Sequence, residues 1–142
     1  MAITYNGSTL RCGSDATSDT INGGFVLLTQ TQLINQNSTA AVSATFTLPA
    51  SSQLVQILAD VTTAFNSATT AVLTVGTAAA GTQYVTSVDA KTGGRAAVSH
   101  TAAQATAMGD LTTNQSVVAT VTPTGATSAG QVRITLVYAQ KV

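Results

Sequence analysis

The sequence predicts an all-β fold, a single β-sandwich or jelly roll of about seven to nine short strands. Three observations lead to this class. Apolar residues alternate with Thr and Ser along several segments, which is the period of a half-buried strand. Gly, Pro and Asn cluster between these segments as turn signals. Hydrophobic residues make up 44% of the 142 residues, enough to bury one core.

The chain divides into an N-terminal arm, residues 1–24, and a β-sandwich domain, residues 25–142. The arm is polar and Gly-rich and ends at Asn22-Gly23-Gly24, a strong turn signal. We expect a short strand around Ile3–Tyr5 and then an extended interaction segment. So polar a stretch buries little by itself, and it would order best against a neighbour.

The first strands of the domain are predicted over Phe25–Ile34 and Val42–Leu48. The second alternates strictly between apolar and hydroxyl-bearing residues. Pro49 stops it, because proline cannot donate to a β-ladder.

The next segment, Leu54–Val61, fits both a helical and a strand period. Its β-branched residues and the Thr62-Thr63 continuation favour a strand. The residues that this strand would turn to the core are Val55, Ile57, Ala59 and Val61. Thr62–Thr70 is then a loop that Phe65 anchors.

Further strands are predicted over Ala71–Gly76, Tyr84–Val88 and Val117–Val121, the last of them closed by Thr122-Pro123-Thr124-Gly125. Residues 95–111 fit either one strand or a short helix over Thr101–Met108. The last strand is the most regular and is expected to pair centrally in a sheet. Its inward side chains are Val132, Ile134, Leu136 and Tyr138.

Charged residues are rare in this sequence. They form 7% of the chain, five basic and five acidic with no Glu, against about 25% in typical domains. The basic residues are scattered, so they form neither the patch that binds nucleic acid nor the one that binds a membrane surface. A neutral surface offers little repulsion between copies, and we expect a homo-oligomer, either a trimer or a dimer.

No catalytic or cofactor site is predicted, and the protein is expected not to be an enzyme. His100 is the single histidine, so a Ser-His-Asp triad would need it beside Asp60, Asp89 or Asp110. No nucleophile-elbow pattern surrounds the serines. We interpret His100 as a turn or surface residue.

Metal binding is not predicted either. Asp15, Asp19 and Asn22 are the only local cluster of oxygen ligands, and their spacing differs from that of a calcium-binding EF-hand loop. We interpret them as turn and capping residues. The single cysteine, Cys12, is interpreted as a semi-buried thiol.

No signal peptide or apolar run of about 20 residues stands out in the sequence. We therefore expect synthesis in the cytoplasm of the producing cell.

Several segments of the chain share a pattern in the way their strands end. The pattern is a strand ending at proline, a strand ending in a Thr-Ala-Phe-Asn loop, a strand ending at Val-Gly-Thr, and a regular last strand. The segments that carry it are Thr47–Ala50, Val55–Ile57, Asp60–Ser67, Ala71–Thr77 and Gly130–Tyr138. In these segments the chain resembles small β-sandwich structural proteins of tailed-phage virions. The resemblance implies a capsid decoration or cement protein, or a head-fibre-like protein. It also implies location in the virion and contact with the major capsid protein or other virion proteins.

Two alternatives remain open from the sequence. One is a head–tail connector, collar or tail component. The other is a receptor- or carbohydrate-binding module, in which a tyrosine would stack on the sugar. The tyrosines available for this are Tyr5, Tyr84 and Tyr138.

Overall fold

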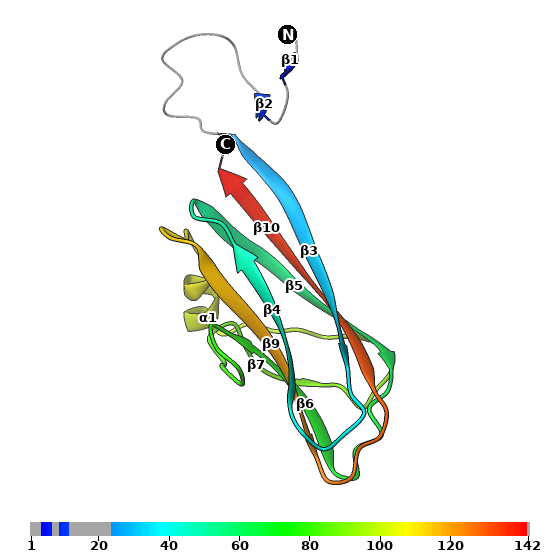
Figure 1. The fold of residues 1–142 in the computed structure, drawn as a ribbon. Coiled ribbons are helices and arrows are strands. Elements are labelled where there is room, and N and C mark those ends of the chain that lie inside the picture. Colours follow the sequence, from blue (N-terminus) through cyan, green and yellow to red (C-terminus); the bar gives the residue numbers. More distant parts are fainter. Residues whose placement is uncertain (1–3, 7–8, 12–23, 142) are drawn as a thin grey trace.

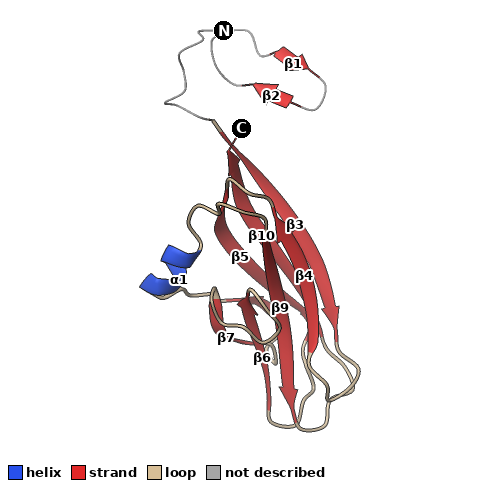
Figure 2. Cartoon of the chain, turned by 60° about the vertical axis from the view of Figure 1, so that its left-hand side comes forward, coloured by secondary structure: helices blue, strands red, loops and turns tan. Residues whose placement is uncertain are grey.

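The computed structural model describes residues 4–6, 9–11 and 24–141. Residues 24–141 form a sandwich of two four-stranded antiparallel sheets (Figure 1). Its strands are β3 (Phe25–Asn35), β4 (Val42–Leu48), β5 (Ser52–Thr63), β6 (Thr70–Gly76), β7 (Val85–Asp89), β8 (Gly94–Ala96), β9 (Gln115–Thr124) and β10 (Gln131–Lys141). One short helix, α1 (Ala102–Ala107), lies at one side of the sandwich (Figure 2).

The strand order identifies the sandwich as a jelly roll. One sheet has the order β3-β10-β5-β8 and the other β4-β9-β6-β7. The first of the eight strands therefore pairs with the last, the second with the seventh, the third with the sixth and the fourth with the fifth. This is a long hairpin rolled into two layers, the connectivity of a jelly roll. The predicted all-β sandwich is confirmed.

Alternation along the strands builds the core between the sheets. In β4, Ala44, Phe46 and Leu48 are buried while the intervening Thr45 and Thr47 are exposed. β4 ends at Leu48, before Pro49, as predicted. β10 lies between β3 and β5, so its predicted central pairing is confirmed. The four inward residues predicted for β10 are all buried.

A β-bulge in β5 explains why residues 54–61 fit two periods. Val137 of β10 is paired with Gln56 and Tyr138 with Leu54, so Val55 is the extra residue. Because the bulge reverses the alternation, Leu54 and Ile57 both face the core although they are three residues apart. The strand prediction is confirmed, but Val55 was wrongly predicted to face the core; its side chain is 49% exposed.

Residues 94–111 contain both of the elements that the sequence offered as alternatives. β8 is followed by α1, and Thr101 caps the helix by accepting a hydrogen bond from the Gln104 backbone N–H. Gln104 completes the capping box by accepting from the Thr101 backbone N–H. The Gln104 amide also donates to the Thr82 carbonyl and to the Thr86 hydroxyl, which fixes α1 beside β7.

The predicted end of β9 at Val121, before a turn from Thr122, was wrong. β9 continues to Thr124 and contains Pro123, which is paired with Ala71 of β6. On the other side of β9, pairing with β4 extends only to Val121. Proline is tolerated where one side of a strand carries no ladder. The turn begins instead at Gly125, whose φ of 84° favours glycine.

The predicted loop anchored by Phe65 is confirmed, though it is shorter than expected. β5 runs to Thr63 and β6 begins at Thr70. Phe65 is 1% exposed, and a Cβ on Gly130 would collide with its ring. The loop is therefore closed over the end of the core by the close approach of an aromatic ring to a glycine.

Most predictions for the arm lie outside the described residues. These include Cys12, the turn and capping residues Asp15 and Asp19, and the turn at Asn22-Gly23. Within the described part of the arm, β1 (Thr4–Asn6) overlaps the expected strand and pairs in antiparallel fashion with β2 (Thr9–Arg11), which the sequence did not predict. Among the residues described, no helix is long and apolar enough to cross a membrane.

Candidate interaction surface

Four successive rungs of side chains on the outward side of the β3-β10-β5-β8 sheet make up what we call the outer face, and the Phe25–Lys141 pair lies beyond its last rung. Each rung contains residues that the strand register places opposite one another. The rungs are Leu33–Arg133–Asp60–Arg95, Thr31–Thr135–Leu58, Thr29–Val137–Gln56 and Leu27–Ala139–Gln53. The outer face therefore crosses three long strands and the short β8.

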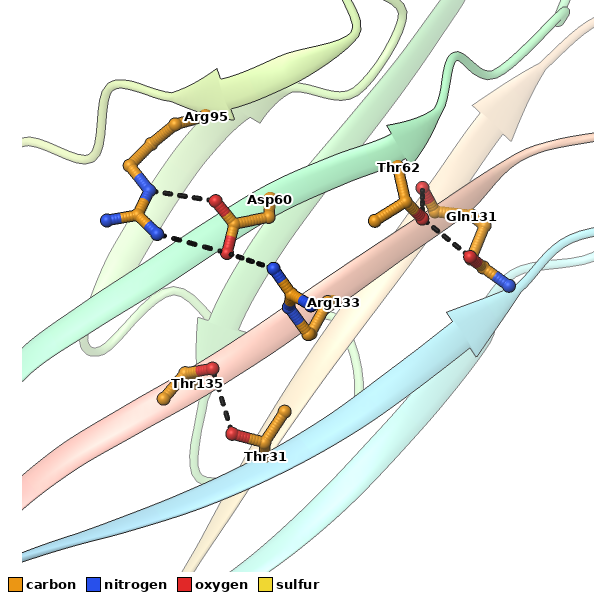
Figure 3. Close-up of polar contacts among 7 residues, drawn as sticks. All are labelled: Thr31, Asp60, Thr62, Arg95, Gln131, Arg133 and Thr135. Atoms are coloured by element: carbon orange, nitrogen blue, oxygen red, sulfur yellow. Dashed lines mark hydrogen bonds and ion pairs between the residues drawn. The ribbon is translucent and has the colours of Figure 1, made fainter.

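The charges of these four rungs all lie in the first rung (Figure 3). The Asp60 carboxylate accepts two hydrogen bonds from Arg95, at 2.8 Å from Nε and 3.2 Å from Nη2. Arg133 Nη2 is 3.3 Å from the same carboxylate. Antiparallel pairing places these three residues side by side on β8, β5 and β10. The one carboxylate of the rung is thus paired with both arginines, and one positive charge is left over in the rung.

The other three rungs contain only hydroxyl, amide and aliphatic side chains. In the second rung the hydroxyls of Thr31 and Thr135 are 2.9 Å apart and share a hydrogen bond across the strands (Figure 3). Thr also loses little side-chain entropy when it is covered, unlike Lys or Arg. A partner can cover these rungs without removing an unpaired charge from water.

The outward side of the opposite sheet differs, because the chain itself covers its centre. The loop that joins β6 to β7 lies over β9, where the Ala80 N–H donates to the Thr120 hydroxyl at 2.9 Å. Thr120 and the neighbouring Val118 point outward from the sheet, yet both are buried. The described part of the chain thus covers the centre of the β4-β9-β6-β7 sheet but leaves the outer face of the other sheet accessible.

The structure does not bring together the residues considered for catalysis. His100 Nδ1 lies 2.9 Å from the carbonyl oxygen of Tyr84 in a half-buried loop. Asp89 accepts from the Lys91 backbone N–H and the Thr92 hydroxyl, while Asp60 is held by two arginines. Within residues 24–141, no hydrogen bond joins His100 to an aspartate. No group of three His, Cys, Asp or Glu side chains there could hold a metal ion.

The tyrosines considered for sugar stacking are not available for it on the described sandwich. Tyr84 and Tyr138 are both buried in the core. A ring that stacks on a sugar must present one face to solvent, so neither residue can serve. The side chain of Tyr5 lies outside what the structure describes.

The ion pairs of Asp60 make the stability of the fold depend on pH in a way that can be tested. Hydrogen bonds from Arg95 and Arg133 hold the pKa of Asp60 below its ordinary value of about 3.9. The folded chain then binds fewer protons than the unfolded one, so this stabilisation is present above that value and is lost as the pH falls through the lowered pKa. We expect Asp60→Asn to show a smaller drop in Tm than the wild type between about pH 6 and pH 2.

The Tm of both proteins should be followed by circular dichroism across that range. Asp89→Asn is the comparison variant, because backbone and hydroxyl donors rather than arginines lower the pKa of Asp89. High salt should reduce the contribution of Asp60 to the pH dependence of Tm more than that of Asp89, since ion pairs are screened. Identical pH profiles for the wild type and Asp60→Asn would contradict the assignment.

Fold and surface together define the class of this protein: a jelly-roll domain with one accessible, nearly neutral sheet face. Comparisons of the chain with protein-family models, with curated proteins and with solved structures find no match. The function is therefore argued from the surface itself.

Proposed function

We propose that the protein is a non-enzymatic structural component of a tailed-phage virion that binds the major capsid protein through its outer face. In this role it is a cement or decoration protein, repeated on the capsid lattice. The observation that carries the proposal is the composition of the outer face, where three successive rungs are uncharged and the remaining one pairs its single carboxylate with two arginines.

Burial of such a face is energetically favourable for simple reasons. Leu58, Val137 and the aliphatic parts of the threonines gain from removal of apolar surface from water. Thr and Ala lose little rotamer entropy when a partner covers them, so less of this gain is offset. The only carboxylate of the four rungs, Asp60, already has two cationic partners. Its negative charge therefore stays compensated when it is covered.

The sequence adds a second kind of support. The resemblance to small virion proteins includes β10 and the segment from β5 into β6, and β5 and β10 are the two central strands of the outer-face sheet. A protein repeated many times on a shell also benefits from a formal net charge of zero. Neighbouring copies then have no net repulsion between them.

The test is the structure and composition of purified virions from the phage that encodes the chain. We expect cryo-EM density for an eight-stranded jelly roll on the head lattice, with the β3-β10-β5-β8 sheet toward the capsid protein. Absence of the chain from the particle would overturn the proposal. Density confined to the neck or tail would overturn the cement role and favour the connector alternative.

A pair of variants tests the surface separately from the location. Thr135→Asp places a charge at the centre of the outer face, where burial against a partner would be costly. Thr122→Asp places the same charge at an exposed position of β9 in the opposite sheet. We expect particles to lose the Thr135→Asp protein and to retain the Thr122→Asp protein. Equal retention would show that another surface makes the contact.

A further inference from the structure

The edges of the two sheets are protected to different degrees. An exposed edge strand offers unpaired backbone groups to another chain, and proteins usually shorten, cover or charge such edges. β7 and β8 are short, with five and three residues. The carbonyls of Thr47 and Thr45 on β4 accept hydrogen bonds from the side-chain amides of Gln30 and Gln32, at 2.9 and 2.6 Å.

β3 is the edge strand without such protection among the described residues. It has 11 residues, and its register with β10 is continuous from Phe25 to Asn35, without a bulge. It contains no charged residue and no proline. Of the five exposed large hydrophobic side chains in the described part of the chain, four lie on it, and Leu27 is the most exposed at 65%. The four are Phe25, Leu27, Leu28 and Leu33.

The sequence of β3 is nearly symmetric about its middle residue, Gln30. Reading outward from Gln30, Thr29 corresponds to Thr31, Leu27 to Leu33 and Val26 to Ile34. If two identical strands pair in antiparallel fashion about Gln30, five kinds of cross-strand pair form around that residue. Three of the five therefore join residues of matching chemistry. Only Leu28 with Gln32 and Phe25 with Asn35 differ.

We propose that β3 pairs with β3 of a second copy in antiparallel register centred on Gln30, which joins two β3-β10-β5-β8 sheets into one eight-stranded sheet. The backbone permits this register. Residues opposite each other have numbers that sum to 60, so both members of every pair direct their N–H and C=O groups to the same side of the strand. A two-fold axis then relates the copies, and each face of the new pair is self-complementary.

Side chains and charge favour a second copy over a different partner. On the outer face, Leu27 lies against Leu33 of the other copy at both ends, and Thr29 against Thr31 in the centre. Cross-strand pairs of this kind stabilise sheets. No charge on β3 opposes the approach of an identical strand. Dimerisation of the isolated chain does not depend on the proposed virion role, so it can hold or fail independently of it.

The test uses charge at the two central threonines of the full chain. The wild type is expected to have twice the 14.2 kDa mass of one chain in light scattering. Thr29→Lys with Thr31→Lys brings four like charges together and should raise the dissociation constant at least about a hundredfold. Thr29→Glu with Thr31→Glu should do the same. An equimolar mixture should form a one-to-one heterodimer, because each Lys then faces a Glu.

The control is Thr122→Lys with Thr124→Lys, two exposed threonines at the same spacing on β9. This variant should remain a dimer. Circular dichroism of all variants verifies that the monomers are folded. A monomeric wild type would overturn the proposal, as expected if the chain's own first residues covered β3. Dimers that persist in the lysine variant, or a mixture without heterodimer, would overturn it equally.

Discussion

Replacement of Phe65 by alanine is expected to lower the free energy of unfolding by about 3–5 kcal/mol, the range for large-to-small aromatic substitutions in cores. Phe65 is one of the largest fully buried side chains, although it lies in the loop between β5 and β6. The surrounding loop is tied to the β9–β10 loop, since Asn66 Oδ1 accepts from the backbone N–H groups of Ser128 and Ala129. These bonds hinder the loop from collapsing into the cavity that removal of the ring would leave. The loss of unfolding free energy therefore stays large.

Urea unfolding of the wild type and Phe65→Ala measures this difference. A second substitution tests the cause. A Cβ at Gly130 would collide with the Phe65 ring, so Gly130→Ala should be destabilising in the wild type. The same change should cost less in a Phe65→Leu background, because the ring is absent. Additive effects of the two substitutions would contradict direct packing of Phe65 on Gly130.

Gly76→Ala is expected to destabilise the fold by about 1–3 kcal/mol through overpacking. Gly76 is the last residue of β6, and the loop to β7 folds back on it. A Cβ there would lie 2.5 Å from the carbonyl carbon of Gly81 and 2.7 Å from its Cα. The Gln83 side-chain oxygen is nearer still and can swing away, but the Gly81 backbone cannot, so the loop would have to move.

The matched control is Gly93→Ala, where the nearest atom to an added Cβ is 3.9 Å away. That variant should be neutral, or slightly more stable through reduced entropy of the unfolded chain. Thermal unfolding compares the two alanine variants directly. Equal Tm values would show that the β6–β7 loop does not pack on Gly76 as described.

The sequence was most informative where the strand period was uninterrupted. β4 and β10 follow regular alternation, so the bounds of β4 and the core-facing residues of both strands could be predicted. In β5 the sequence indicated a strand, but its alternation assigned Val55 to the wrong face. A bulge depends on how the neighbouring strand is paired, and the sequence of β5 alone does not contain that pairing.

Pro123 and residues 94–111 illustrate the same limit. A proline is a stop signal only if both sides of its strand are paired, and the register of β4 against β9 decides that. The capping residues of α1 were present in the sequence as Thr101 and Gln104. The segment is too short and too rich in alanine for its period to separate a helix from a strand.

The sequence by itself determined the all-β class, the near absence of charge and the lack of a recognisable catalytic pattern. The tertiary structure decided which residues meet. The charged residues nearest to Arg95 in the sequence are Lys91 and Asp89. Antiparallel pairing of β8 with β5 nevertheless places Arg95 against Asp60. The same pairing gathers distant neutral residues into the outer face. Composition is a property of the chain alone, whereas a surface exists only once long-range register has brought its strands side by side.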